Sequence, residues 1–359
     1  MINKLVKHEH VLLALSEIDK TKVPSRRQST KYDLHHDGKI YPPKYVLSIA
    51  TKFASGKELE ASEFGGGDET NNFLISLGFE IREGYKIIKK NNSEIQSTNR
   101  KINICTAIIQ IPGDNWADIS NSKKHKMLSE LLENMYKYTD ILILPAGFLN
   151  SKAKEPKTIY KKTEKIFSNL IKEHNDKLTI CFGIDGRNGS KGDQMGLAIN
   201  KSGIIAVARK FHHTNDEVNL ADSPFSEEDG MRRDFIIKGK RPFIAVCYDV
   251  YGIRKKNLEN TDNYDFVIGL IHEFEKNRGG DSDFARKGLA GASKQWNVNT
   301  YASSVFSGNR NPSNWPSGVE WNHGEASVKD FYYDDIRLEN KSKELETDIA
   351  KIYLRYFQE

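Results

Sequence analysis

The segment PFIAVCYDVYG, residues 242–252, constrains the fold of this chain more than any other. Its apolar run from Phe243 to Val246 predicts a buried strand that ends at Cys247. In an open α/β sheet, ligands and reactive groups gather at the carboxyl ends of the strands. A thiol at such a place is a candidate nucleophile, because the thiolate attacks and a nearby cation lowers its pKa. The alternative is that Cys247 only fills the core, as free cysteines usually do.

The length and composition limit the kinds of protein that this chain can form. With 359 residues it favours two domains, and its 3 cysteines do not make a disulfide framework. No apolar run approaches the roughly 20 residues that span a bilayer, and the N-terminus lacks the pattern of a signal peptide. We therefore expect a cytoplasmic protein. The net charge of +5 permits contact with nucleic acid without indicating it.

A change in composition marks the domain boundary. Residues 91–101, NNSEIQSTNRK, hold one aliphatic side chain among polar and charged ones, which is typical of an exposed linker. We therefore expect a head domain over residues 1–90 and a larger domain over residues 102–359.

The larger domain alternates strand-like runs with amphipathic helical patterns. Apolar runs predict strands at 102–111, 140–145, 178–185, 243–249 and 264–273, with a hairpin turn at Lys201–Gly203. This order predicts a mixed α/β sheet layered with helices. Residues 342–359 carry apolar side chains at helical spacing, so we expect a closing amphipathic helix there.

Two short motifs carry a family resemblance. ARKFHH at 208–213 and CYDVYG at 247–252 resemble the lysine and cysteine motifs of the carbon–nitrogen hydrolase (nitrilase) superfamily. The resemblance covers roughly residues 102–336. It implies an αββα sandwich, domains that commonly pair into homo-oligomers, and a Glu-Lys-Cys triad whose lysine and cysteine are Lys210 and Cys247.

The glutamate of that triad is missing. The family's first strand-end motif reads Pro-Glu, whereas DILILPAGFLN has Ala146 at this place. Three explanations stay open. The domain is catalytically degenerate; or Asp185, Asp249 or His212 replaces the base; or Lys210, neutral through burial, is itself the base. Asp185 also suits a turn and His212 a surface position.

Two functions follow from these residues. In the first, Cys247 attacks an amide or nitrile carbon, while Lys210 and the backbone N–H of Tyr248 stabilise the negative charge that develops. In the second, a catalytically degenerate domain serves as a sensor or scaffold that acts with nucleic-acid or protein partners. The spacing of His and Cys indicates no metal site, and neither a phosphate loop nor a dinucleotide motif is present, so we expect no cofactor.

The head domain carries a second resemblance. DGKIYPPKYVLSIA, FGGGDET and LGF are similar to the N-terminal head domain of ScoMcrA-type modification-dependent restriction endonucleases. The resemblance covers about residues 10–81 and implies a role in prokaryotic anti-phage defence, with DNA or other defence proteins as partners. Residues 1–90 hold 15 Lys and Arg against 12 Asp and Glu, a weak footprint for phosphate binding. The candidate nucleic-acid contacts are Arg26, Arg27, Lys39 and Lys44, and the alternative is a solvated charged face.

Overall fold

The computed structural model divides into two compact units, residues 1–98 and 99–359. The structure describes residues 5–21, 23–24, 27, 29, 31–36, 39–60, 63–65, 67–83, 86–87, 101–153, 155–186, 193–213, 219–277, 279–321, 333–336 and 341–359.

The first unit packs helices against a small antiparallel sheet. Its helices are α1 (His8–Thr21), α2 (Pro43–Ser55) and α3 (Asp68–Ser76), and its strands are β1 (Tyr32–His36), β2 (Lys39–Tyr41), β3 (Glu80–Glu83) and β4 (Lys86–Ile87). The strand order is β2-β1-β3-β4. Leu15 of α1, Leu47 of α2 and Leu34 of β1 meet in one apolar core. The unit is the small α+β head domain that the sequence predicted.

The second unit holds two groups of strands, which a two-residue pairing between β5 and β13 connects. The first group has the order β10-β9-β8-β6-β5, with β17 and β16 beyond β5 and β7 beside β8. The second group has the order β11-β12-β13-β14-β15. The bounds are β5 (Asn103–Gln110), β6 (Ile141–Ile143), β7 (Leu149–Asn150), β8 (Thr179–Asp185), β9 (Gln194–Asn200), β10 (Gly203–Arg209), β11 (Pro242–Val246), β12 (Phe266–Phe274), β13 (Asn299–Phe306), β14 (Gly318–Trp321), β15 (Tyr333–Asp335), β16 (Ser342–Glu346) and β17 (Lys351–Gln358).

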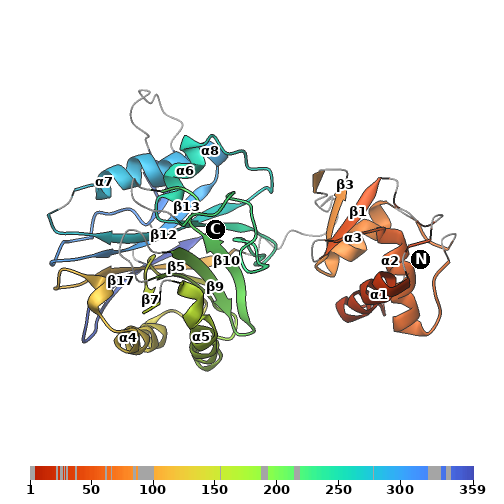
Figure 1. Ribbon diagram of the computed structural model, residues 1–359, viewed down its shortest axis with the longest axis horizontal. Coiled ribbons are helices and arrows are strands. Elements are labelled where there is room, and N and C mark those ends of the chain that lie inside the picture. Colours follow the sequence, from red (N-terminus) through yellow and green to blue (C-terminus); the bar gives the residue numbers. More distant parts are fainter. Residues whose placement is uncertain are drawn as a thin grey trace. The chain divides into compact units, whose positions relative to one another are not determined.

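Helices cover the outer faces of these two layers, as Figure 1 shows. The helices α4 (Asn121–Asn134) and α5 (Tyr160–His174) pack on β6, β8 and β9. On the other side, α6 (Asp249–Lys255) and α8 (Ala290–Trp296) pack on β11 and β12. The helix α8 directly follows α7 (Asp281–Asp283) and a π-helical turn at Phe284–Leu289. A third apolar cluster fills the space between the two layers. The unit therefore has the αββα layering that the sequence predicted.

The expected C-terminal helix is wrong. Residues 342–346 and 351–358 form the antiparallel hairpin β16–β17, and β17 pairs with β5 along its whole length. At the start of β17, buried Ile352 and Leu354 alternate with half-buried Lys351 and Tyr353, so the apolar pattern there also fits a period of two. The open edge of β5 selects the strand, because pairing satisfies backbone groups that a helix would leave exposed there.

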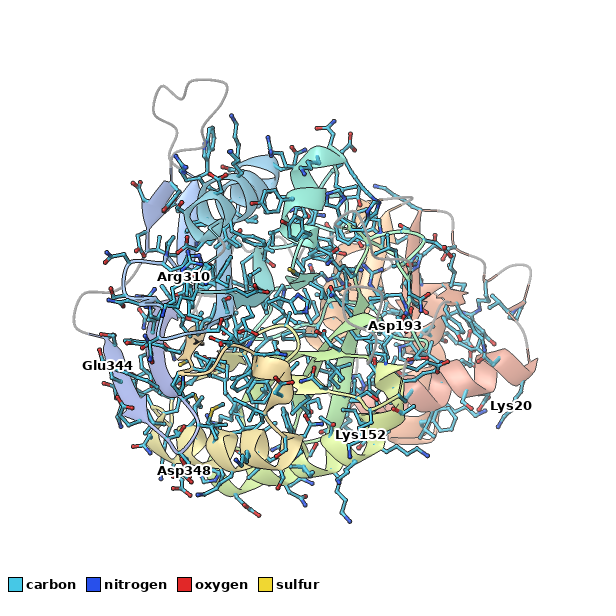
Figure 2. All side chains as sticks on the ribbon, turned by 60° about the vertical axis from the view of Figure 1, so that its left-hand side comes forward. Lys20, Lys152, Asp193, Arg310, Glu344 and Asp348 are labelled. Atoms are coloured by element: carbon cyan, nitrogen blue, oxygen red, sulfur yellow. The ribbon has the colours of Figure 1, made fainter. Side chains whose placement is uncertain are left out.

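Polar side chains cover the outside of the second unit. Lys152, Glu344 and Asp348 are exposed, whereas Asp193 is buried (Figure 2). Among the described residues, no helix has the length and apolarity needed to cross a membrane.

Candidate functional site

Cys247 lies in a sharp turn at the end of a buried strand. All five residues of β11 are buried, and α6 starts at Asp249. The backbone of Cys247 has a φ of +51°, in the left-handed region that L-residues other than Asn and Asp seldom occupy. Its N–H donates to the carbonyl of Leu270 at 2.7 Å. The turn thus holds the thiol against β12, where 7% of the residue is exposed.

A histidine from the neighbouring strand lies beside this thiol. The Nε2 of His272, in β12, lies 2.9 Å from Oδ2 and 3.1 Å from Oδ1 of Asp185, the last residue of β8. Both side chains are 23% exposed, so a small molecule can reach them. Because β8 and β12 belong to different layers, the carboxylate and the imidazole meet only when the sandwich forms.

The charges of this group change both pKa values. Burial acts to raise the pKa of the Cys247 thiol, but the charges of His272 and Lys210 and hydrogen bonds from His272 outweigh it, so the pKa is lowered. Burial acts to lower the pKa of His272, but the charges of Asp185 and Cys247 outweigh it and raise the pKa to about 10. A thiolate beside an imidazolium is the form that these shifts favour at neutral pH.

The Asp185–His272 pair lies against Gly147, the residue that follows Ala146. Ala146 lies three residues after Ile143, the last residue of β6, and it is itself buried. A Cβ at Gly147, whose φ is +56°, would lie 2.6 Å from Oδ2 of Asp185 and 3.3 Å from Cδ2 of His272. The absence of a side chain at Gly147 therefore leaves the space that Asp185 and His272 occupy.

Lys210 lies on the other side of the thiol, directly after β10. It is 2% exposed, and its Nζ donates to Oε1 of Gln194 at 2.8 Å. The same Nζ lies 5.6 Å from the ring centroid of Tyr248. Its charge is one of those that lower the pKa of Cys247. The structure thus brings together Lys210 and Cys247, the two residues that the motifs predicted.

Asp249 and His212 occupy places outside this group. Asp249 is fully buried, and its carboxylate accepts hydrogen bonds from the backbone N–H groups of Phe211, His212 and Val246 and pairs with Arg233 at 3.1 Å. It ties the cysteine turn to the segment that follows Lys210. Burial and the nearby lysines of α6 lower the pKa of His212 to about 4, so its imidazole is neutral.

His272 was not among the residues singled out from the sequence. The signal available was a polar His-Glu pair at the end of the apolar run YDFVIGLIHE, in the strand that follows the cysteine strand. Of the three candidate replacements for the glutamate, the structure brings Asp185 to the imidazole beside the thiol.

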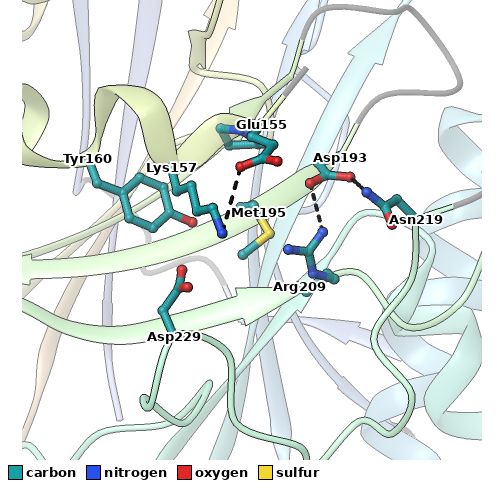
Figure 3. A pocket seen from close by; sticks show the side chains of 9 residues that line it. Glu155, Lys157, Tyr160, Asp193, Met195, Arg209, Asn219 and Asp229 are labelled. Carbon is teal, nitrogen blue, oxygen red and sulfur yellow. Dashed lines mark hydrogen bonds and ion pairs between the residues drawn. The ribbon is translucent and has the colours of Figure 1, made fainter. Parts of the chain in front are cut away.

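A separate pocket lies behind Lys210, on the face of β9 and β10 that α5 covers. Figure 3 shows it, with a volume of about 140 Å³. Arg209 pairs there with Asp193 at 2.8 Å and with Glu228 at 2.7 Å. These ion pairs hold Asp193 and Arg209 in place. Gln194 directly follows Asp193, and Lys210 directly follows Arg209.

The candidate contacts of the head unit have partners within it. Arg27 lies 3.7 Å from Glu58 and Lys39 lies 2.9 Å from Asp19. Nζ of Lys44 lies 5.0 Å from the ring centroid of Phe64. Arg26 lies outside the described residues. Each described side chain is therefore partly engaged before any nucleic acid is bound.

Across the part of the chain that the structure describes, no three His, Cys, Asp or Glu side chains are grouped closely enough to hold a metal ion.

Comparison with known proteins separates the two units. Residues 4–83 match the family profile of the ScoMcrA-like N-terminal head domain. No curated protein is significantly similar to the chain in sequence. One similar solved structure is a double mutant of the amidase from Nesterenkonia sp. AN1 in complex with acrylamide; it is 8% identical, covers 72% of this chain and 90% of its own, and has a TM-score of 0.44. Another, a carbon–nitrogen hydrolase from Helicobacter pylori G27, is 13% identical, covers 71% and 89%, and has a TM-score of 0.44.

The chain therefore joins two kinds of domain. Residues 4–83 of its first unit match the ScoMcrA-like head domain, and its second unit has an αββα layering.

Proposed function

We propose that the second unit hydrolyses the carbon–nitrogen bond of a small amide or nitrile, with Cys247 as the nucleophile. The observation that carries this proposal is the contact of His272 with both Asp185 and the thiol of Cys247. In a cysteine hydrolase, an imidazole beside the thiol supplies the base, and a third group orients that imidazole. Here His272 and Asp185 take the role that the absent glutamate would have.

The proposed reaction of an amide has two halves. The Cys247 thiolate attacks the carbonyl carbon, and the imidazolium of His272 gives its proton to the nitrogen as the amine leaves, which produces a thioester. Water then loses a proton to neutral His272 and attacks the thioester, and the carboxylic acid leaves. The thiolate and the imidazolium are regenerated. A nitrile first forms a thioimidate, which takes up water and loses ammonia to give the same thioester.

Lys210 and Tyr248 are assigned to the charge that develops on the substrate. Lys210 is buried and its Nζ is held by Gln194, so its ammonium is fixed beside the thiol before substrate arrives. A preorganised cation in a water-poor site stabilises an oxyanion more than the same cation in water. The backbone N–H of Tyr248 is the second assigned donor. In this proposal Lys210 acts as a cation, and His272 acts as the base.

Ammonia release tests the proposal on the full chain. The wild type, Cys247→Ala, His272→Ala and the control Cys181→Ala are incubated with a panel of small amides and nitriles. We expect ammonia from the wild type and the control, and none above background from the other two. Cys181 is fully buried between the layers, so its removal keeps the site intact.

The rate of thiol alkylation distinguishes the hydrolase from the alternative function. That alternative is a non-catalytic sensor or scaffold, which Ala146 in place of the glutamate favours. An activated thiolate reacts with iodoacetamide at neutral pH faster than an ordinary thiol does. If Cys247 reacts no faster than an ordinary thiol, and no substrate of the panel is hydrolysed, the hydrolase proposal is wrong and the non-catalytic function stands.

For the head unit we propose a role in prokaryotic anti-phage defence, in a cytoplasmic homo-oligomer, with DNA as a partner. The match of residues 4–83 to the ScoMcrA-like head domain supports it. The paired state of Arg27 and Lys39 predicts weak binding, because each pair must open before a phosphate can replace the carboxylate. Retention on DNA that falls steeply with salt is expected, and retention that salt does not change argues against phosphate contacts.

A further inference from the structure

A second lysine is buried on the side of the site opposite Lys210. Lys124, in the first turn of α4, has an exposed fraction of 0%. Within the described residues its Nζ has no hydrogen-bond partner. Lysines are almost never fully buried without a partner, because an ammonium loses its hydration there. The burial of Lys124 must therefore be explained by the charged groups around it.

The ring of Trp116 links Lys124 to the site. Nζ of Lys124 lies 4.5 Å from the Trp116 ring centroid. The indole Nε1 donates to the carbonyl of Gly147 at 3.1 Å, and the backbone N–H of Trp116 donates to Oε2 of Glu273 at 2.9 Å. Gly147 is the residue that makes room for Asp185, and Glu273 follows His272. The ring that contacts the ammonium is therefore part of a residue bonded to Gly147, which lies against Asp185, and to Glu273, which follows His272.

The carboxylates that act on Lys124 come from three different elements. In decreasing order of effect they are Asp185 at the end of β8, Glu273 of β12 and Asp118 in the turn before α4. His125, the next residue of α4, is a further titratable neighbour. Oε1 of Glu273 is also buried and has no hydrogen-bond partner in the described part of the chain. Asp185 thus lies between two cations, the imidazolium of His272 and the ammonium of Lys124.

We propose that Lys124 is a positioning residue of this site, whose buried positive charge acts on the Asp185–His272 pair and so on the ionisation of Cys247. This inference rests on the proposed function of Cys247 and His272. A positive charge beside Asp185 raises the electrostatic potential at the neighbouring groups, which makes it less favourable for them to bind protons. It therefore favours the thiolate and opposes the imidazolium. Burial lowers the pKa of Lys124 to about 7, despite Asp185 and Glu273, so its charge is present in acid solution, is about half lost near pH 7 and is absent in alkaline solution.

The test is the pH dependence of Cys247 alkylation in the full chain, measured with iodoacetamide and mass spectrometry. Lys124→Met keeps the apolar stem and removes the charge. Without that charge the thiolate is less favoured, so the acid limb of the profile moves up by about one pH unit, and alkylation below it slows roughly tenfold. Lys123→Met is the matched control, because Lys123 is exposed on the same helix and its charge is screened by solvent. A lysine that only fills space would change stability without moving the profile.

Lys124→Arg keeps the proposal testable even if the methionine variant does not fold. Its charge persists above pH 7, where that of Lys124 is lost. The pKa of His272, about 10 in the wild type, is then expected to fall by about one unit in an NMR titration of labelled histidine.

The role of Lys124 and the hydrolase activity are contradicted by different results. If wild-type Cys247 reacts quickly but its profile is the same in Lys124→Met, or His272 titrates unchanged in Lys124→Arg, Lys124 has no positioning role and the proposed hydrolase stands. If wild-type Cys247 reacts like an ordinary thiol, the proposed function and the role of Lys124 are both wrong.

Discussion

Replacing Asp185 by asparagine removes the charge that holds His272 as an imidazolium and keeps the shape of the side chain. The pKa of His272 rises from an ordinary 6.5 to about 10 in spite of burial, and among the charges that raise it Asp185 has the largest effect. A rise of this size corresponds to about 5 kcal/mol of preference for the charged form. A single opposite charge in direct contact contributes roughly 1–3 units. We therefore expect the pKa of His272 to fall by about two units in Asp185→Asn, which corresponds to about 3 kcal/mol.

This change also has a defined effect on stability. A group whose pKa is raised in the folded state stabilises that state fully below its unfolded pKa, and the contribution is lost as the pH rises through the folded value. The free energy of unfolding of the wild type should therefore exceed that of Asp185→Asn most clearly at pH 5 to about 6.5, the ordinary pKa of histidine, and the difference should shrink as the pH approaches about 10.

Two measurements check the expectation for Asp185→Asn. NMR titration of labelled histidine follows the His272 ring, and urea unfolding at several pH values gives the free energies. The alkylation rate of Cys247 is followed in the same samples. Cys105 and Cys181 serve as internal controls, because both are fully buried and burial raises their thiol pKa values. If His272 still titrates near pH 10 in the variant, the carboxylate of Asp185 does not hold the imidazolium, and the reasoning is refuted.

Three further changes give distinct results. Lys210→Met should raise the pKa of the Cys247 thiol by about one unit and slow its alkylation about tenfold at pH values below that pKa. An unchanged dependence of the alkylation rate on pH would show that the ammonium of Lys210 does not act on the sulfur. Gly147→Ala should slow the same alkylation, because the new methyl group displaces the carboxylate of Asp185; equal rates would contradict the close approach. Asp249→Asn should lower the free energy of urea unfolding by about 3–5 kcal/mol, since it leaves the buried guanidinium of Arg233 without its counter-charge, and a loss below about 1 kcal/mol would argue against a bracing role.

The predictable parts of this fold lie in single contiguous segments. The buried run before Cys247 and the hairpin around Lys201–Gly203 follow from local apolar patterns, and the structure has strands at both. The prediction of a C-terminal helix was wrong because it also used only a local pattern. Apolar spacings that fit a helix also fit the strand β17, and pairing with the distant edge of β5 decides between the two. A local pattern cannot report an edge that another segment provides.

From periodicity and short motifs the sequence by itself predicted a mixed α/β sheet layered with helices and the strand ends that carry Cys247 and Lys210, because each depends on one short stretch. The αββα layering and the head domain followed from the family resemblances that these motifs carry. Only the tertiary structure decided what stands beside the thiol in place of the missing glutamate. Asp185 and His272 lie 87 positions apart, on strands of different layers, and Lys124 reaches the same region from a helix outside both. Their contact depends on how the two sheets stack, and so do the pKa values of His272 and Cys247, since a charge acts through distance in space and through the solvent that burial removes.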